Sequence, residues 1–305
     1  MLFRSDADAI ADRRRLKRRL VVWRLVALVI FLGALAIAFW STDRLSLGDR
    51  VAAIDIDGVI LNDPERLRTL QRIAQDDSIK ALIVHIDSPG GTVVAGEELY
   101  RSLRQISANK PVAALIGGTG ASAAYMIALA SDRVFVRENS ITGSIGVVLQ
   151  SFDVTGAMEK LGIGATTIKS APLKDQPNPF EPITPAARAA IQAVVDDTYR
   201  WFVDLVIQRR ALPAATALQL SDGRIYTGRQ AVALNLVDAV GGLDEARTWL
   251  ADVKQVPLNL PVHRIEPDTD WEMPGGLFGW ARKTLLSETL RIDGLVSLWQ
   301  PEVLR

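Results

Sequence analysis

Blocks of apolar and polar residues alternate along the chain and predict strands and helices in turn. Strands are predicted at residues 51–60, 80–87, 111–116 and 133–136, with further strands at 145–149 and 165–168. The run at 80–87 is almost continuously apolar, which is typical of a strand that is covered on both faces. Helices are predicted between the strands, at residues 65–75, 97–106, 120–130 and 158–161. This alternation predicts an α/β fold with a parallel sheet and flanking helices on both faces.

The second half of the chain is mainly helical in its pattern. Thr184 followed by Pro185 is typical of a helix start, and apolar residues at three- and four-residue spacing continue to about residue 210. Residues 223–250 predict two more helices. Beyond residue 257 the pattern weakens, although residues 277–299 have the composition of an amphipathic segment. Such a segment packs on a partner, on a bilayer surface or on its own domain, and the sequence leaves these possibilities open.

The stretch at residues 20–40 is apolar except for Arg24 and predicts a single membrane-spanning helix. At about 1.5 Å per residue it is roughly 31 Å long, close to the roughly 30 Å hydrocarbon core of a bilayer. A cluster of arginines and a lysine lies just upstream, and the positive-inside rule keeps such a cluster in the cytoplasm. The alternative is a cleaved secretory signal, because residues 34–36 have the A-x-A pattern of a cleavage site. The length of the run and the bulky Phe39 and Trp40 favour a retained anchor.

These patterns divide the chain into five parts. They are a basic cytoplasmic tail (1–19), a transmembrane helix (20–40), a linker (41–50), an α/β domain (51–255) and a C-terminal arm (256–305).

Composition narrows the chemistry that the chain can perform. Its 305 residues include no cysteine and only two histidines, His85 and His263, and the formal net charge is zero. Disulfides, thiolate nucleophiles and cysteine metal ligands are therefore excluded, and two histidines alone do not build a metal site. His85 lies in a predicted buried strand and is expected to be a core residue. The balanced charge gives no general attraction to nucleic acid, and no cofactor site is predicted.

Three loops break the apolar rhythm with small and polar residues, and such loops are where sites assemble in parallel sheets. They span residues 87–91, 117–125 and 168–175. Gly90 and Gly91 can aim backbone N–H groups at one point, as in an oxyanion hole, or can simply form a tight turn. Ser122 lies near the start of a predicted helix, where the dipole stabilises negative charge. Lys174 must lose its proton to act as a base, which burial promotes.

Each of these features also has a simpler interpretation. The small residues around Ser122 would allow close helix packing, and Gly118, Gly120 and Ala123 match a dinucleotide-binding fingerprint. That fingerprint normally opens the fold, whereas here it follows the third strand. Ser122 lacks the G-x-S-x-G frame, which argues against a lipase-type elbow. Lys174, considered alone, has the pattern of a solvated surface lysine.

Taken together, four short motifs resemble the signal peptide peptidase A (SppA) family, serine peptidases of the ClpP/crotonase fold. They are DSPGG at 87–91, ASAAY at 121–125, TGSIGV at 142–147 and IKSAPLKD at 168–175, within a resemblance that runs from about 51 to 250. The resemblance implies that Ser122 is the nucleophile and Lys174 the general base. It implies that Ser144 orients the lysine and that the N–H groups of Gly91 and Ala123 form the oxyanion hole.

Two details refine these assignments. Lys174 is favoured over Lys169, because the base in this family precedes an aspartate and Lys174 precedes Asp175. The family commonly has two glycines after the nucleophile, whereas this chain has Ala123 and Ala124. Alanine is small and keeps its N–H group, so activity is expected to survive the difference.

The resemblance also implies a biological setting. Members degrade remnant signal peptides and similar apolar peptides, and they form ring-like homo-oligomers in which the serine and lysine loops of neighbouring subunits meet. The catalytic domain is therefore expected on the outer, periplasmic side of the cytoplasmic membrane, with the N-terminus in the cytoplasm. Two alternatives remain open: a catalytically silent membrane scaffold of the same fold, and a crotonase-like acyl-CoA enzyme.

Overall fold

The computed structural model describes residues 23–33 and 48–266 and the backbone of residues 296–298. Contacts divide the chain into two units, Met1–Gly48 and Asp49–Arg305. In the first unit, residues 23–33 form a helix. Within the described parts of the chain, no helix is both long enough and apolar enough to cross a membrane. The span predicted at residues 20–40 extends past the described residues at both ends, so it stays a prediction.

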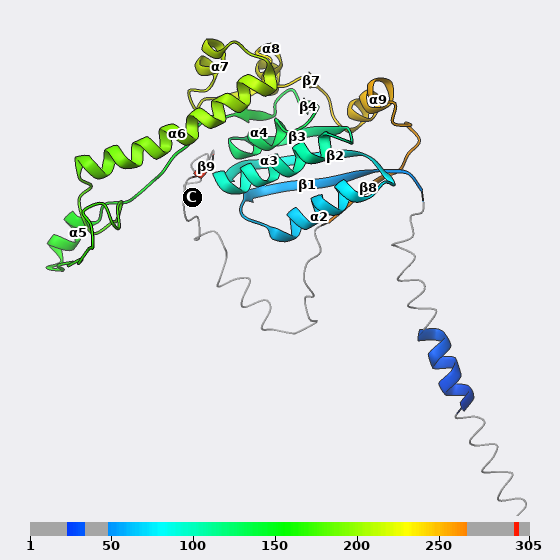
Figure 1. The fold of residues 1–305 in the computed structure, drawn as a ribbon, viewed down its shortest axis with the longest axis horizontal. Helices are drawn as coiled ribbons and strands as arrows, with labels where there is room; N and C mark the ends of the chain where they lie inside the picture. Colours follow the sequence, from blue (N-terminus) through cyan, green and yellow to red (C-terminus); the bar gives the residue numbers. More distant parts are fainter. Residues whose placement is uncertain (1–22, 34–47, 267–295, 299–305) are drawn as a thin grey trace, which may run out of the picture. The chain divides into compact units, whose positions relative to one another are not determined.

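The centre of the second unit is a sheet whose strands are mostly parallel (Figure 1). β1 pairs with β2, β2 with β3, and β3 with both β4 and β5, all in parallel. The β5–β6 and β2–β9 pairs are antiparallel. The described strands are β1 (Arg50–Ile60), β2 (Ile79–Thr92), β3 (Val112–Ala121), β4 (Arg133–Val136), β5 (Ile141–Gly143), β6 (Ile225–Thr227), β7 (Ala239–Val240), β8 (Val262–Arg264) and β9 (Val296–Leu298).

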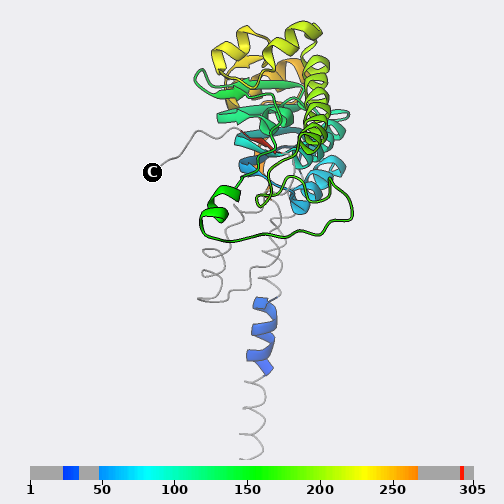
Figure 2. The same ribbon diagram turned by 90° about the vertical axis from the view of Figure 1, so that its left-hand side faces the viewer.

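Helices cover both faces of this sheet. Because side chains alternate along a strand, Leu82 and Val84 of β2 enter one core and Ala81 and Ile83 enter the other. The first core lies under α2, α3, α4 and part of α6, and the second packs against Trp249 of α9 (Figures 1 and 2). The described helices of this unit are α2 (Pro64–Gln75), α3 (Val93–Ser107), α4 (Ala123–Ala128), α5 (Thr155–Lys160), α6 (Pro185–Arg210), α7 (Ala214–Leu220), α8 (Gly228–Ala233) and α9 (Leu243–Lys254).

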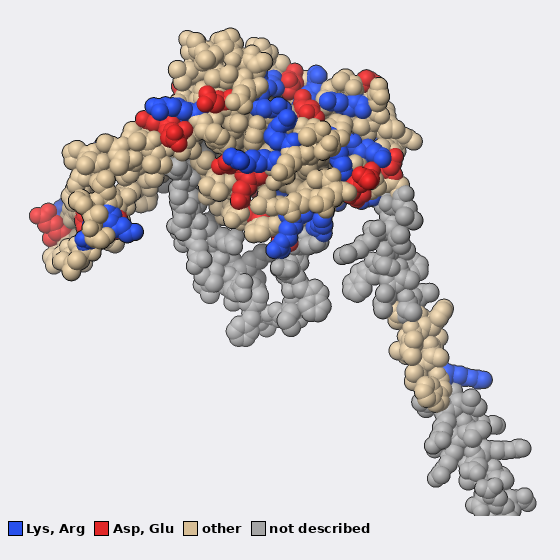
Figure 3. Space-filling view, viewed as in Figure 1, with Lys and Arg blue, Asp and Glu red and all other residues tan. Residues whose placement is uncertain are grey.

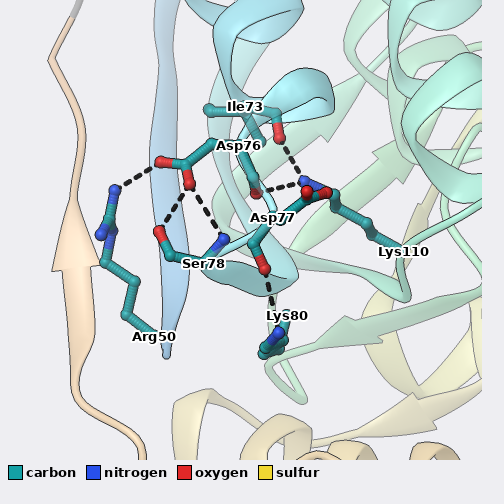
Figure 4. Close-up of polar contacts among 7 residues, drawn as sticks. All are labelled: Arg50, Ile73, Asp76, Asp77, Ser78, Lys80 and Lys110. Carbon is teal, nitrogen blue, oxygen red and sulfur yellow. Dashed lines mark hydrogen bonds and ion pairs between the residues drawn. The ribbon is translucent and has the colours of Figure 1, made fainter. Parts of the chain in front are cut away.

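A polar cluster joins the end of α2 to the start of β2 (Figure 4). The Asp76 carboxylate accepts hydrogen bonds from the Ser78 hydroxyl at 2.5 Å and from the Arg50 guanidinium at 2.6 Å. The Lys110 ammonium donates to the carbonyls of Ile73 and Asp76, at 2.7 and 2.6 Å, and so caps α2. The Ser78 hydrogen bond, with help from Arg50, lowers the pKa of Asp76 below its usual 3.8 even though burial opposes this.

Most predicted elements are confirmed, and a few are wrong. The strands predicted at 51–60, 80–87, 111–116 and 133–136 correspond to β1 to β4, and Thr184 does cap α6. The strands predicted at 145–149 and 165–168 are absent from those described stretches, and β5 ends at residue 143 instead. The helix predicted at 120–130 is only α4, because β3 continues to Ala121. The amphipathic segment at 277–299 lies outside the described residues except for the strand β9.

Candidate active site

Two predicted site serines follow directly after neighbouring strands. Ala121 of β3 pairs with Gly143 of β5, so Ser122 and Ser144 are the next residues on adjacent strands. The Ser122 N–H group donates to the Gly143 carbonyl at 2.8 Å, which ties the two loops together. Both serines are buried, with exposed fractions of 1% and 9%.

Ser122 occupies a strained turn between β3 and α4. Its φ of 61° and ψ of −121° form a combination that residues with a Cβ rarely adopt, at a cost of about 1–3 kcal/mol. Ala123 is the first residue of α4, and N–H groups in the first turn of a helix have no partner within it. The turn therefore places a serine hydroxyl and the Ala123 N–H group next to each other in sequence and at one helix start.

Backbone strain recurs at Ser144 and at Asp175, the residue after Lys174. In the part of the chain that the structure describes, six non-glycine residues have positive φ, and three of them are Ser122, Ser144 and Asp175. Ser144 has a φ of 49°, and its N–H group donates to the Arg224 carbonyl at 2.8 Å. Such strain persists only where the surrounding structure enforces it, and it often marks functional sites.

Gly91 lies where β2 has a neighbour on each edge. It pairs with Ile60 of β1 on one edge and with Ser297 of β9 on the other. A Cβ at Gly91 would lie only 1.9 Å from the Ile60 carbonyl oxygen, so the close approach of β1 and β2 requires glycine. β3 pairs with β2 only as far as Ser88. Beyond that point, β9 pairs with the same edge of β2 at residues 90–92, and Ser122 follows the end of β3 on that side.

Lys174 lies on a different part of the fold. Residues 151–194, which we call the extension, include α5 and the first part of α6, and Figure 1 shows them reaching beyond the sheet. The Lys174 side chain is exposed, and its backbone N–H group donates to the Ala171 carbonyl at 3.1 Å. Asp175 beside it has a φ of 67° and accepts a hydrogen bond from the Asn178 amide at 3.2 Å. These contacts give the lysine loop a defined turn.

The neighbouring lysine has a different environment. The Lys169 ammonium forms an ion pair and hydrogen bond with Glu181, and its side chain is only 14% exposed. The hydrogen bond from Lys169 lowers the pKa of the Glu181 carboxyl. The Lys169 ammonium is therefore already engaged by a carboxylate within the extension.

Comparison with known protein families identifies the fold and the class of activity. The family profile named Peptidase family S49 matches residues 104–257, about half of the chain and a range that includes Ser122, Ser144 and Lys174. The chain belongs to peptidase family S49. A Clp protease profile matches residues 64–143 as well, in agreement with the predicted ClpP-like fold. S49 membership makes the protein a serine-type peptidase of the SppA-like group.

Several proteins with similar sequences carry protease names. A Synechocystis sp. protein named as a candidate protease is 35% identical over 228 residues, which cover 74% of this chain and 80% of that protein. A candidate protease of Methanocaldococcus jannaschii is 37% identical over 190 residues, covering 62% of this chain and 61% of the relative. A protein of Enterococcus faecium named as a candidate signal peptide peptidase SppA is 30% identical over 241 residues, covering 74% and 70%.

The two histidines of this S49 chain lie away from Ser122. His85 is on the sheet face of Ala81 and Ile83, whereas α4 packs into the opposite core. Burial lowers the pKa of His85, and Asp55 next to it on β1 opposes this effect. His263 is exposed on β8, beside the start of β1. Neither imidazole is placed to take a proton from Ser122.

One feature of this S49 site was missed from the sequence. Because the chain lacks G-x-S-x-G, the sequence argued against a lipase-type nucleophile elbow. The structure nevertheless has a strained serine on a strand-to-helix turn, which is the arrangement found in lipase-type hydrolases. The residue two positions before Ser122 is still a glycine, and a Cβ at Gly120 would lie 2.7 Å from the Ile116 side chain. The residue two positions after it is Ala124, which is fully buried. The small residues on both sides of Ser122 were the sequence signal for this turn.

A hollow of about 540 Å³ lies between the extension and the adjoining residues 147–149 and Val195, and Ser122 is not among the residues that line it. Val147 and Val148, the segment around Pro177 and Asn178, and α6 residues such as Val195 line it. Pro177 and Asn178 follow Lys174 closely in sequence, so the hollow lies near the lysine loop along the chain.

Proposed function

We propose that this chain is a membrane-anchored serine endopeptidase in which Ser122 is the nucleophile and Lys174 is the general base. The observation that carries the proposal is the strained conformation of Ser122 at the start of α4, beside a β2 edge that pairs with an extended segment. Strain of this kind is retained where it serves a reaction, because relaxing it would stabilise the fold. Membership of a serine peptidase family supports the same role.

In the proposed reaction, the Ser122 oxygen bonds to the carbonyl carbon of the substrate while the Lys174 amine takes the hydroxyl proton. The N–H groups of Gly91 and Ala123 stabilise the negative charge on the carbonyl oxygen. The carbon–nitrogen bond then breaks, and Lys174 gives its proton to the leaving amine. Water attacks the acyl-enzyme, Lys174 takes a proton from it, and that proton returns to the Ser122 oxygen as the acid product leaves.

Lys174 is proposed to act across a subunit boundary. A lysine serves as a base only when neutral, and burial favours the neutral form, yet Lys174 is exposed in the single subunit. The extension also exposes large apolar side chains, and on the face shown in Figure 3 its charged residues lie near its tip. These exposed side chains include Phe152, Leu161, Ile163, Ile168, Leu173, Phe180 and Val194. Such a surface supports the proposal of a ring-like homo-oligomer, because packing subunits together would cover it.

Ser144 is proposed to orient the lysine. Its loop is already tied to the Ser122 loop through the Gly143 carbonyl, and its side chain is buried on a backbone with a φ of 49°, outside the β conformation. A lysine arriving from a neighbouring subunit would meet both serine hydroxyls at the ends of β3 and β5.

The proposed substrates are remnant signal peptides and similar apolar peptides in an extended conformation. The edge of β2 at Gly90–Thr92 forms backbone hydrogen bonds with a strand that runs antiparallel to it, which is the way that many proteins bind extended peptides. The apolar stretch at residues 20–40 would hold the enzyme in the cytoplasmic membrane, with the catalytic domain on the outer side.

The decisive experiment is labelling with a fluorophosphonate, which reacts only with an activated serine. The full-length wild-type protein is expected to be labelled and to hydrolyse an apolar peptide, whereas Ser122→Ala is expected to do neither. Lys174→Arg keeps the positive charge but cannot act as a base, so it is expected to lose activity as well. Ser151→Ala and Lys160→Ala change exposed residues of the extension and serve as matched controls.

The outcomes separate the competing functions. Labelling of wild-type protein that persists in Ser122→Ala would remove Ser122 as the nucleophile. Activity retained in Lys174→Arg would remove Lys174 as the base. A folded wild-type protein with neither labelling nor hydrolysis would favour the silent scaffold, and tight binding of coenzyme A in calorimetry would favour an acyl-CoA enzyme.

A further inference from the structure

Hydroxyl side chains occupy three alternate positions along the segment that enters and leaves β5: Ser140, Thr142 and Ser144. All are buried, with exposed fractions of 2%, 0% and 9%. The Ser140 hydroxyl donates to the Gly117 carbonyl at 2.5 Å, and the Thr142 hydroxyl donates to the Gly120 carbonyl at 2.7 Å. Two of the three hydroxyls therefore fasten β5 and its approach to the glycine-rich end of β3, which carries Ser122.

The Thr142 contact lies next to the nucleophile. Gly120 is two residues before Ser122 and directly opposite Thr142 in the β3–β5 pairing. The residue after Thr142 holds the other side of the turn, because the Gly143 carbonyl accepts the Ser122 N–H at 2.8 Å. Adjacent residues of β5 thus hold the chain on both sides of Ala121, one through a side chain and one through the backbone.

This stretch of β3 needs external support. The sequence G-G-T-G at residues 117–120 has few side chains to fix it, and glycine adopts more backbone conformations than any other residue. Ser122 at φ 61° and ψ −121° would relax toward an ordinary conformation if the preceding residues could rotate. A rotation there would move the Ser122 hydroxyl relative to Gly91 and Ala123.

We propose that Thr142 is a positioning residue for the nucleophile: its hydrogen bond to the Gly120 carbonyl holds Ser122 in the strained conformation that catalysis uses. The inference rests on the proposed role of Ser122. Thr142 does not touch the reacting atoms, and its effect is transmitted through Gly120 and Ala121. A displacement of about 1 Å at a reacting group can lower the rate about hundredfold, so the loss of this one contact is expected to be visible in kcat.

The test compares Thr142→Val with Ser140→Ala in the full-length protein. Valine has nearly the shape of threonine but lacks the hydroxyl, so Thr142→Val removes the hydrogen bond without opening a cavity. Ser140→Ala removes a similar buried hydroxyl-to-carbonyl bond, but at Gly117, which is farther from Ser122. A purely structural role predicts that the two variants behave alike, whereas a positioning role predicts that only Thr142→Val slows the reaction.

Thr142→Val is expected to lower kcat and the rate constant of fluorophosphonate labelling by about tenfold or more, with KM within about twofold of wild type. Ser140→Ala is expected to change kcat by less than about threefold, and Thr142→Ser is expected to recover most of the lost rate because it restores the donor. Rates are compared per folded molecule, with circular dichroism confirming the fold. If Thr142→Val does not fold, Thr142→Ala and Thr142→Ser are compared in the same way.

Equal labelling rates for wild type, Thr142→Val and Ser140→Ala would overturn the inference while leaving Ser122 as the nucleophile. An equal loss of rate in Thr142→Val and Ser140→Ala would also overturn it, because general loosening of β3 would then explain both. Wild-type protein that is not labelled at Ser122 would instead refute the proposed function on which the inference rests.

Discussion

Replacing Gly91 with alanine tests how closely β1 and β2 approach beneath the proposed oxyanion hole. The new Cβ would lie 1.9 Å from the Ile60 carbonyl oxygen and 2.6 Å from the Ile60 carbonyl carbon. Side-chain Cβ atoms essentially never approach other heavy atoms within 3.0 Å. Both neighbours are backbone, so no side chain can rotate away and the two strands must separate by about 1 Å.

Two separate effects follow from this displacement. Forcing an extra carbon into a packed region costs about 1–3 kcal/mol of unfolding free energy. Moving the Gly91 N–H group by about 1 Å misaligns one of the two proposed donors to the carbonyl oxygen, and removing one such donor lowers kcat by about 10²–10³. Gly91→Ala is therefore expected to lower kcat by about hundredfold, with a smaller change in KM.

The assay pairs steady-state hydrolysis of an apolar peptide with urea denaturation followed by circular dichroism. Gly146→Ala is the matched control, because the nearest atom to its new Cβ, the Gly223 Cα, is at an ordinary 3.8 Å. That control is expected to keep both kcat and stability close to wild type. A Gly91→Ala enzyme that is as stable as wild type would refute the steric argument, and one that is destabilised but keeps its kcat would remove Gly91 from the oxyanion hole.

Two further predictions concern stability. Tyr125→Phe is expected to lower the unfolding free energy by about 1–3 kcal/mol in urea, because it removes a fully buried hydrogen bond of 2.7 Å to the Leu236 carbonyl; an unchanged midpoint would contradict this. Because the folded pKa of Asp76 lies below its usual 3.8, its contribution to stability is present above about pH 4 and is lost as the pH falls through the lower, folded value. Asp76→Asn is therefore expected to flatten the acid side of the stability profile, and a profile parallel to that of wild type would refute the role of the cluster with Arg50 and Ser78.

The central strands were predictable because their environment is uniform. The central stretches of β1 to β3 lie between two helical layers, so runs such as Ala81–Val84 and Val112–Ile116 are continuously apolar whatever the details of packing. The start of α6 was predictable for a local reason, since the Thr184 hydroxyl accepts the Ala187 N–H group and Pro185 needs no donor.

The wrong strands show where such reasoning fails. Residues 165–168, Ala-Thr-Thr-Ile, were predicted as a strand, yet Ile168 is 96% exposed on the extension. An apolar sequence pattern indicates which side chains are favourable to bury. It does not indicate whether the surface that buries them belongs to the same subunit. β8 was missed because it is only three residues long and pairs with β1, which is distant in the sequence.

The candidate site likewise has parts that the sequence could predict and parts that it could not. The roles of Gly91, Ser122 and Lys174 come from the motif resemblance and stay predictions. Gly91 and Ser122 do lie at the ends of the parallel strands β2 and β3, where loops gather at one edge of a sheet, whereas Lys174 lies on the extension. The strain at Ser122 and the support from Thr142 could not be predicted, because both depend on how β5 aligns with β3 across more than twenty intervening residues. The contribution of Lys174 stays a prediction, since it depends on a neighbouring subunit.

The placement of β9 bears on how a peptide would enter this site. A strand edge offers each N–H and carbonyl group only once, and residues 296–298 already use the edge at Gly90–Thr92. A peptide that binds at this edge, as proposed above, would have to displace residues 296–298, and its apparent affinity would be reduced according to the fraction of molecules in which the edge is vacant. In the proposed enzyme, the β2–β9 pairing would therefore raise the peptide concentration that is needed to fill this edge.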